Sequence, residues 1–92
     1  MPVFSSSEIA EGLISNPDWS LENGALTRSF SLTDFREAMS FVNSVAVLAE
    51  SAGHHPDIDI RYNKVNLALS SHDAGGITER DFSLAAKIGE IL

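Results

Sequence analysis

The hydrophobic residues of this chain follow two different periods. In three stretches, near the start, in the middle and at the end, apolar residues recur at intervals of three and four, which is typical of amphipathic helices. Between these stretches they recur at every second position, which is typical of strands with one buried face. The order predicts an α+β fold, α-β-β-α-β-β-α, in which three helices pack on one face of a four-stranded antiparallel sheet.

Two of the helices have recognisable start signals. Ser5 with Glu8, and Thr78 with Asp81, are hydroxyl and carboxylate residues three positions apart, the spacing of a capping box. Asp81 is therefore interpreted as a helix-start residue and not as part of a pocket. The first helix should stop before Asn16-Pro17. These two helices are expected to bury Ile9, Leu13, Ile14, Phe82, Ala85, Ile88 and Leu92.

The middle helix is the longest predicted element. It should begin at Thr33 or Asp34 and end at Gly53, because glycine readily takes the left-handed conformation that terminates a helix. Phe41 and Leu48 widen its apolar surface beyond one stripe, so this helix is either deeply buried or in contact with another subunit. Its other apolar positions are Phe35, Ala38, Met39, Val42, Val45, Ala46 and Ala49.

The strands are predicted to form two hairpins. Asn23-Gly24 is a turn signal for the first, and Asn63-Lys64 is taken as the two-residue turn of the second. The side chains expected to face the core are Leu26, Phe30, Leu32, Ile58, Ile60, Tyr62, Val65, Leu67 and Leu69. In this register Tyr62 faces Val65, Ile60 faces Leu67 and Ile58 faces Leu69, so every apolar side chain meets an apolar partner.

The same register brings histidines together that are far apart in the sequence. It places His72 opposite His55, and opposed residues have β-carbons only about 4.5 to 5.5 Å apart. His54, at the exit of the middle helix, should lie close by. We therefore expect three imidazoles to converge at the open end of the second hairpin.

Residue types alone leave three interpretations of this cluster open. Imidazoles exchange protons near neutrality, so several around one pocket suit general acid and base catalysis. With Glu50 they could instead bind a divalent metal, although adjacent histidines diverge. They could also be polar residues at a strand end with ordinary hydrogen bonds. Glu50 lies one helical turn before His54 and could accept a hydrogen bond from its ring.

Composition narrows the class of protein. Ninety-two residues with 43% hydrophobic content suit a single domain over residues 1–92, and a domain of this size often gains stability by association. The chain has no cysteine, so it has neither disulfides nor thiolate metal ligands. A net charge of −7 disfavours direct binding to nucleic acids and to anionic membranes. With no signal peptide or long apolar run in the pattern, we expect a cytoplasmic protein.

The histidines belong to a longer motif: Glu50, His54-His55-Pro56-Asp57, Tyr62-Asn63-Lys64-Val65, Ser71-His72-Asp73, Gly76 and Thr78-Glu79-Arg80-Asp81. This motif, and the sequence from about Ser7 to Ile91, resembles the pterin-4a-carbinolamine dehydratase family. The resemblance implies a lyase that converts a 4a-hydroxytetrahydropterin to a quinonoid dihydropterin and water in tetrahydrobiopterin recycling. It also implies a homodimer or homotetramer, with a pterin as substrate and without a metal or separate cofactor.

The resemblance also assigns roles to residues. It places His54 and His72 in proton transfer, and His55 in the same catalytic group but chiefly in holding the pterin. Glu50 would orient one of these histidines. The positions that match the family's substrate-contacting segments are His54, His55, Pro56, Ser71, His72, Asp73 and Ala74. Trp19 and Tyr62 are expected in the core.

A binding function is the alternative. Some members of this family act as dimerisation cofactors of transcription factors, and related proteins are assembly factors for other enzymes. The broad apolar surface of the middle helix, with Phe41 and Leu48, is the feature that could serve such a partner.

Overall fold

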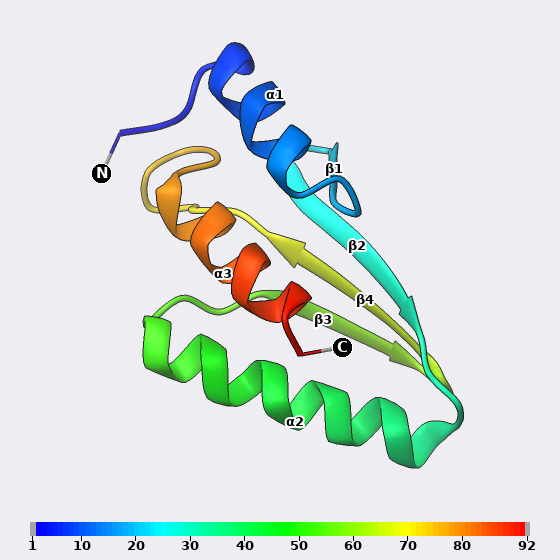
Figure 1. Cartoon of the computed structure of the whole chain (residues 1–92). Helices are drawn as coiled ribbons and strands as arrows, with labels where there is room; N and C mark the ends of the chain where they lie inside the picture. Colours follow the sequence, from blue (N-terminus) through cyan, green and yellow to red (C-terminus); the bar gives the residue numbers. More distant parts are fainter. Residues whose placement is uncertain (1, 92) are drawn as a thin grey trace.

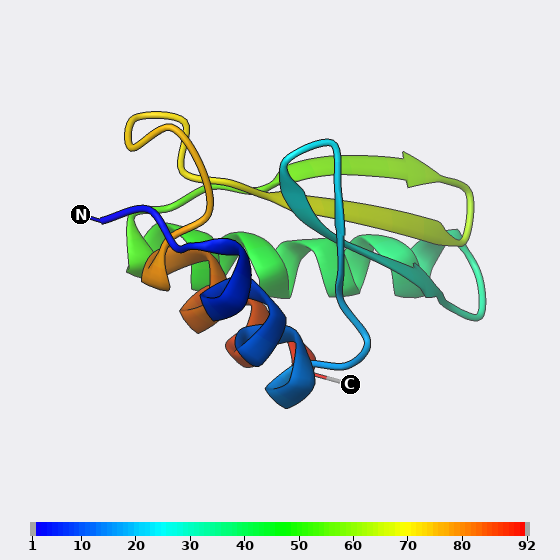
Figure 2. The same ribbon diagram turned by 90° about the horizontal axis from the view of Figure 1, so that it is seen from above.

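The structure is a computed structural model that describes residues 2–91. Its elements are α1 (Ser6–Ser15), β1 (Ser20–Glu22), β2 (Ala25–Ser31), α2 (Phe35–Ala52), β3 (Asp57–Arg61), β4 (Lys64–Leu69) and α3 (Glu79–Gly89). The strands form one antiparallel sheet in the order β1-β2-β4-β3. The three helices lie on one face of this sheet and leave the other face open, as the two views show (Figures 1 and 2). The predicted α+β fold is confirmed.

The predicted helix ends are confirmed. Both capping boxes form, one from Ser5 and Glu8 and the other from Thr78 and Asp81, and α2 ends at Gly53 with a left-handed φ of 61°. α1 has no fully buried residue, and the predicted burial of Ile14 is wrong because this side chain is 78% exposed. α1 lies at the rim of the core, where only its Ile9 and Leu13 side packs inward. Leu92, predicted on the face of the last helix, lies outside the described residues.

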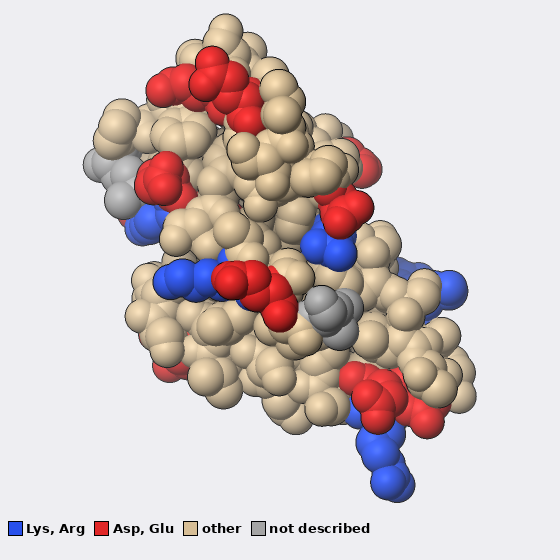
Figure 3. Space-filling model, in the orientation of Figure 1, with Lys and Arg blue, Asp and Glu red and all other residues tan. Residues whose placement is uncertain are grey.

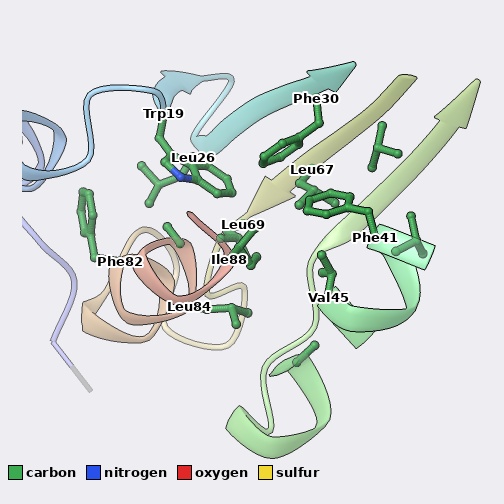
Figure 4. Close-up of a cluster of buried hydrophobic side chains, with 14 of the residues drawn as sticks. Trp19, Leu26, Phe30, Phe41, Val45, Leu67, Leu69, Phe82, Leu84 and Ile88 are labelled. Carbon is green, nitrogen blue, oxygen red and sulfur yellow. The ribbon is translucent and has the colours of Figure 1, made fainter. Parts of the chain in front are cut away.

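The core lies between the sheet and helices α2 and α3 (Figure 4). Phe41 of α2 packs against Phe30 of β2 with ring centroids 4.6 Å apart and is only 4% exposed. Its predicted availability to a partner is therefore wrong. Trp19 is buried against the edge of Phe30, which confirms its place in the core. The largest fully buried apolar side chains are Leu26, Leu67, Leu69, Leu84, Ile88, Val45 and Val65.

The first hairpin turns at Asn23-Gly24 as predicted, but the register of the second is wrong by two residues. Its turn is Tyr62-Asn63, so Ile60 pairs with Val65 and Ile58 pairs with Leu67. A slip of two residues keeps every side chain on its own face, because side chains alternate with a period of two. The predicted faces were therefore correct while the pairing was not, and Ile58, expected to face the core, is 37% exposed because β3 is an edge strand.

A contact outside the hairpin favours the observed turn. The side-chain amide of Asn63 donates to the carbonyl of Leu32 at 2.9 Å, and the backbone N–H of Leu32 donates to the carbonyl of Asn63 at 2.8 Å. These bonds anchor the turn to the end of β2. Tyr62 takes a left-handed φ of 54° and is 66% exposed, so its predicted place in the core is wrong.

Acidic side chains dominate the charged groups of the surface, in line with the net charge of −7. On the helix face they gather over α1, while the Lys and Arg side chains of the described residues are scattered (Figure 3). This face therefore offers no continuous basic surface for a phosphate backbone. Among residues 2–91, no helix combines the length and the apolar character that crossing a bilayer would require.

Candidate active site

His54 is buried directly after the end of α2. Its backbone N–H donates to the carbonyl of Ala49 at 3.1 Å, which fixes the chain as it leaves the helix. The ring turns toward α3, where its Nε2 lies 2.6 Å from Oδ1 of Asp81. The side chain of His54 is 9% exposed and that of Asp81 is 0% exposed. This is a solvent-shielded contact between a histidine and a carboxylate.

Asp81 is the centre of a buried hydrogen-bond network. Its second oxygen, Oδ2, accepts hydrogen bonds from the hydroxyl of Ser71 at 2.9 Å and from the backbone N–H of Thr78 at 2.9 Å. The Ser71 and Thr78 hydroxyls are 2.8 Å apart. Because both oxygens of a carboxylate act as acceptors, and Oδ2 already accepts two hydrogen bonds, we assign the donor role in the contact with Oδ1 to Nε2 of His54. In the neutral ring, Nδ1 is then the nitrogen with a free lone pair.

His55 has a different environment from its neighbour. Its Nε2 contacts Oε2 of Glu50 at 2.5 Å, and the two side chains are 64% and 78% exposed. The predicted bond from Glu50 to His54 is therefore wrong, because Glu50 pairs with His55 instead. The left-handed turn at Gly53 ends the helix before His54, so the one-turn spacing that places Glu50 beside His54 on a continuous helix no longer applies.

His72 lies on the open side of the sheet, after the end of β4. Its Nε2 is 3.2 Å from the hydroxyl of Ser70, and it forms part of the wall of a cavity of about 560 Å³. Neither His54 nor His55 is part of this wall. The other lining residues are Glu22, Asn23, Gly24, Ala25, Thr27, Asp57, Ala68, Ser70, Gly75 and Gly76.

The predicted opposition of His55 and His72 is wrong. Extending the observed register by two residues brings position 55 level with Ser70, and His72 lies beyond that point. All three histidines are nevertheless at the same end of the hairpin, where α2 leads into β3 and β4 ends. His54 contacts α3 on the helix side of the sheet, while His72 lines the cavity on the open side.

Comparison with known proteins identifies the family. A family model described as "Pterin 4 alpha carbinolamine dehydratase" matches residues 2–91. The chain belongs to this family. A Chloroflexus aurantiacus protein named "Putative pterin-4-alpha-carbinolamine dehydratase" is 63% identical over 92 residues, which span 100% of this chain and 99% of that protein. A protein of the same name from Acidobacterium capsulatum is 55% identical over 100% of both chains.

Solved structures agree with this assignment. A Brucella melitensis protein described as "transcriptional coactivator/pterin dehydratase" has 35% sequence identity to this chain and a TM-score of 0.92, with 97% of each chain covered. A pterin dehydratase-like protein identified as a RuBisCO assembly factor has 23% identity and a TM-score of 0.64 over 79% of this chain and 84% of that one. The second likeness shows a shared fold and no more.

The other residues predicted to contact substrate in this family member have varied environments. Ser71 is fully buried in the Asp81 network. Pro56 and Ala74 are half-buried, and Asp73 is exposed and forms an ion pair with Arg80 at 2.6 Å. The hydrogen bond from Arg80 holds the pKa of the Asp73 carboxyl below its usual value. Their contact with a pterin stays a prediction.

Asp81 is the site residue that sequence reasoning missed. Its helix-start role is confirmed, but the same carboxylate also binds His54 from a position 27 residues away. The capping-box spacing was visible in the sequence, whereas its complete burial was not. Within residues 2–91, no three or more histidine, aspartate and glutamate side chains are grouped so that they could hold a metal ion.

Proposed function

We propose that this chain catalyses the dehydration of a 4a-hydroxytetrahydropterin to a quinonoid dihydropterin and water. The observation that carries this proposal is the match of the dehydratase family model to residues 2–91, supported by relatives of 63% and 55% identity. In this reaction the bond between carbon 4a and its hydroxyl oxygen breaks. A proton joins the leaving hydroxyl to form water, and the neighbouring ring nitrogen loses its proton as a carbon–nitrogen double bond forms.

His54 is the proposed base. The carboxylate of Asp81 accepts the Nε2 hydrogen, which leaves the Nδ1 lone pair available for the proton of the ring nitrogen. Once that proton is taken, the ring is positively charged, and the buried carboxylate at 2.6 Å stabilises this charge. This pairing supports a proton-accepting role for His54 more than a proton-donating one.

His72 is the proposed acid. It stands in the wall of a cavity of about 560 Å³, where solvent and a small molecule both have access, and the Ser70 hydroxyl is placed to orient its ring. His55 is proposed to hold the pterin, with Glu50 fixing its ring. The pterin would bind at the end of the β3–β4 hairpin, where His54 lies on the helix side of the sheet and His72 on its open side.

A direct dehydration assay tests the proposed activity. The 4a-hydroxytetrahydropterin is generated in solution, and formation of the quinonoid product is followed by absorbance with and without the purified protein. The rate should rise in proportion to protein concentration and fall in acid, because a protonated imidazole is no longer a base. No acceleration at any pH contradicts the proposal. A chelator should leave the rate unchanged, and a loss would favour the metal interpretation.

A protein-binding role is the second proposal. The Brucella melitensis protein is described both as a coactivator and as a dehydratase, and here Val47 of α2 is 67% exposed. Val47 and Leu48 line a groove of about 440 Å³ between α2 and α3, with Ser44, Lys87, Glu90 and Ile91. An exposed apolar groove of this kind is typical of an interaction surface. We propose that it serves a homodimer or homotetramer, or a protein partner.

Sedimentation measurements test this surface. Val47→Lys should lower the measured mass of an assembly and leave dehydration unchanged. Ile14→Lys is the matched control, because Ile14 is an equally apolar residue that is 78% exposed on α1 and away from the groove. If both substitutions, or neither, alter the assembly, the groove is not the interaction surface.

A further inference from the structure

The loop between β4 and α3 carries His72 and is tied back on itself. The backbone N–H and carbonyl of Ser71 pair with Gly76, and the N–H groups of Ala74 and Gly75 donate to the Ser71 carbonyl at 3.0 and 2.9 Å. His72 lies inside this closed loop and is exposed. These backbone bonds define the shape of the loop, but they lie within it and do not attach the residues between Ser71 and Gly76 to a helix.

One side-chain contact makes that attachment. Nη2 of Arg80, in the first turn of α3, donates to Oδ1 of Asp73 at 2.6 Å, and Asp73 directly follows His72. Among residues 2–91 it is the one ion pair that joins this loop to a helix. Its partners are 28% and 74% exposed, so Arg80 is the better anchored of the two.

The Arg80 side chain is largely enclosed by protein. Its backbone N–H donates to the Thr78 hydroxyl at 3.2 Å, and its Nε atom is buried without a hydrogen-bond partner. A buried donor without a partner has a free-energy cost, so this atom does not stabilise the arrangement, and the bond of Arg80 to the loop is made by its Nη2 atom. Arg80 thus reaches the loop from the capped first turn of α3.

The neighbour of Arg80 in the sequence is Asp81, which holds His54. Two consecutive residues in the first turn of α3 therefore contact the surroundings of both histidines proposed for proton transfer. Asp81 binds the ring of His54 directly, and Arg80 binds the residue that follows His72. The first turn of α3 therefore contacts two segments that are distant in the sequence, the chain that follows α2 and the loop that follows β4.

We infer that Asp73 and Arg80 are a positioning pair for His72: their ion pair fixes the loop of residues 71–76 so that the His72 ring stays in the wall of the cavity. On this assignment Asp73 acts through the loop and does not contact the substrate. The inference rests on the proposed dehydratase function for its kinetic consequence, while its structural consequence is independent of that function.

Three substitutions separate the positioning role from other roles. Asp73→Asn removes the charge at nearly constant size, and Asp73→Glu restores a carboxylate with one more methylene. Asp59→Asn is the matched control, because Asp59 forms a comparable exposed ion pair with Arg61 on β3 at 3.2 Å, away from the loop. Each variant is examined as the full chain by nuclear magnetic resonance and in the dehydration assay.

The expected result has a structural and a kinetic part. Asp73→Asn should speed amide hydrogen exchange at Gly75 and Gly76 and shift the ring signals of His72, while Asp59→Asn should leave both as in the wild type. In the assay, Asp73→Asn should lower kcat roughly five- to tenfold with KM changed less than about twofold, because a loosened loop affects the reacting group more than binding. Asp73→Glu should recover most of both effects.

Other results overturn the inference. If Asp73→Asn leaves loop exchange and the His72 signals as in the wild type, the ion pair does not position the loop. If KM rises and kcat does not fall, Asp73 binds substrate instead. If the Asp59→Asn control shows the same changes, they result from the loss of any surface negative charge and not from the loss of the ion pair at the loop. A wild-type protein without dehydratase activity contradicts the proposed function, and the exchange and ring-signal data then decide the positioning role alone.

Discussion

Two adjacent histidines in this protein make nearly the same contact in opposite environments. Nε2 of His54 lies 2.6 Å from a carboxylate of Asp81, and Nε2 of His55 lies 2.5 Å from one of Glu50. The first pair is almost completely buried, whereas the side chains of the second are 64% and 78% exposed. The two distances are nearly equal, but the two contacts are expected to contribute different free energies to stability because their burial differs. Removing one partner of a buried pair costs about 3–5 kcal/mol, while an exposed pair contributes about 0–1 kcal/mol.

The two pairs also differ in what they connect. Asp81 links the end of β4, through Ser71, with the start of α3, through Thr78, and with the chain that follows α2, through His54. The bond between Glu50 and His55 joins only residues on either side of the end of α2. We expect the first pair to control stability and chemistry together, and the second to control local orientation.

The largest expected effect comes from removing the Asp81 carboxylate. Asp81→Ala leaves the Thr78 N–H and the His54 ring without their acceptor in a buried place, and should lower the free energy of unfolding by about 3–5 kcal/mol in urea denaturation. The matched control is Asp34→Ala, which removes the cap of α2. It should cost about 0.5–2 kcal/mol. Equal losses would show that Asp81 acts only as a helix cap.

Turnover should separate the two histidines. His54→Ala removes the proposed base and should lower kcat by roughly 10²- to 10⁴-fold. His55→Ala should mainly raise KM, by about tenfold, because its proposed role is to hold the pterin. Steady-state assays of both variants measure these values. Similar, mild losses in the two variants would contradict the division of roles.

Glu50→Gln should have a small effect on stability. It keeps the size of the side chain and removes its charge from an exposed pair, so the free energy of unfolding should change by less than about 1 kcal/mol. Adding salt should reduce the difference from the wild type, because exposed charges are screened. Urea denaturation at two ionic strengths provides the measurement. A decrease in the free energy of unfolding as large as that of Asp81→Ala would contradict the proposed difference between the buried and the exposed pair.

The smallest expected effect is an acid-dependent loosening of the loop at Asp73. Arg80 lowers the pKa of the Asp73 carboxyl in the folded protein, so this group stabilises the fold at pH values above its unfolded pKa, about 3.9. The contribution is lost as the pH falls through the lower, folded pKa. Amide exchange of Gly76, corrected for intrinsic rates, should therefore rise in acid in the wild type and show no such step in Asp73→Asn. Identical pH profiles would contradict this expectation.

Much of the fold could be predicted because local physics decides it. The two capping boxes, the left-handed end at Gly53 and the turn at Asn23-Gly24 depend on residues within a few positions of each other. Alternation also gave the correct core face of β4, where Val65, Leu67 and Leu69 are buried. These features need no knowledge of the rest of the chain.

The site was predicted less completely because its contacts are not local. The residue types around the histidines suggested Glu50 as the partner of His54, but the partner is Asp81, which is 27 residues away and inside the core. Phe41 looked like part of an interaction surface until the position of Phe30 showed that it packs inward. In both cases the burial of the side chain, Asp81 or Phe41, decides its role. That burial depends on segments that are distant in the sequence, so the local pattern of residues does not predict it.

The amino-acid sequence by itself determined where the helices begin and which side of each strand is apolar, since backbone caps and side-chain alternation act over short distances. Only the tertiary structure decided the hairpin register and the partner of each histidine. A two-residue slip preserves the apolar face, so alternation is the same in both registers, and the bonds between Asn63 and Leu32 distinguish them. Likewise, Asp81 became a partner for His54 only because α3 packs where α2 ends.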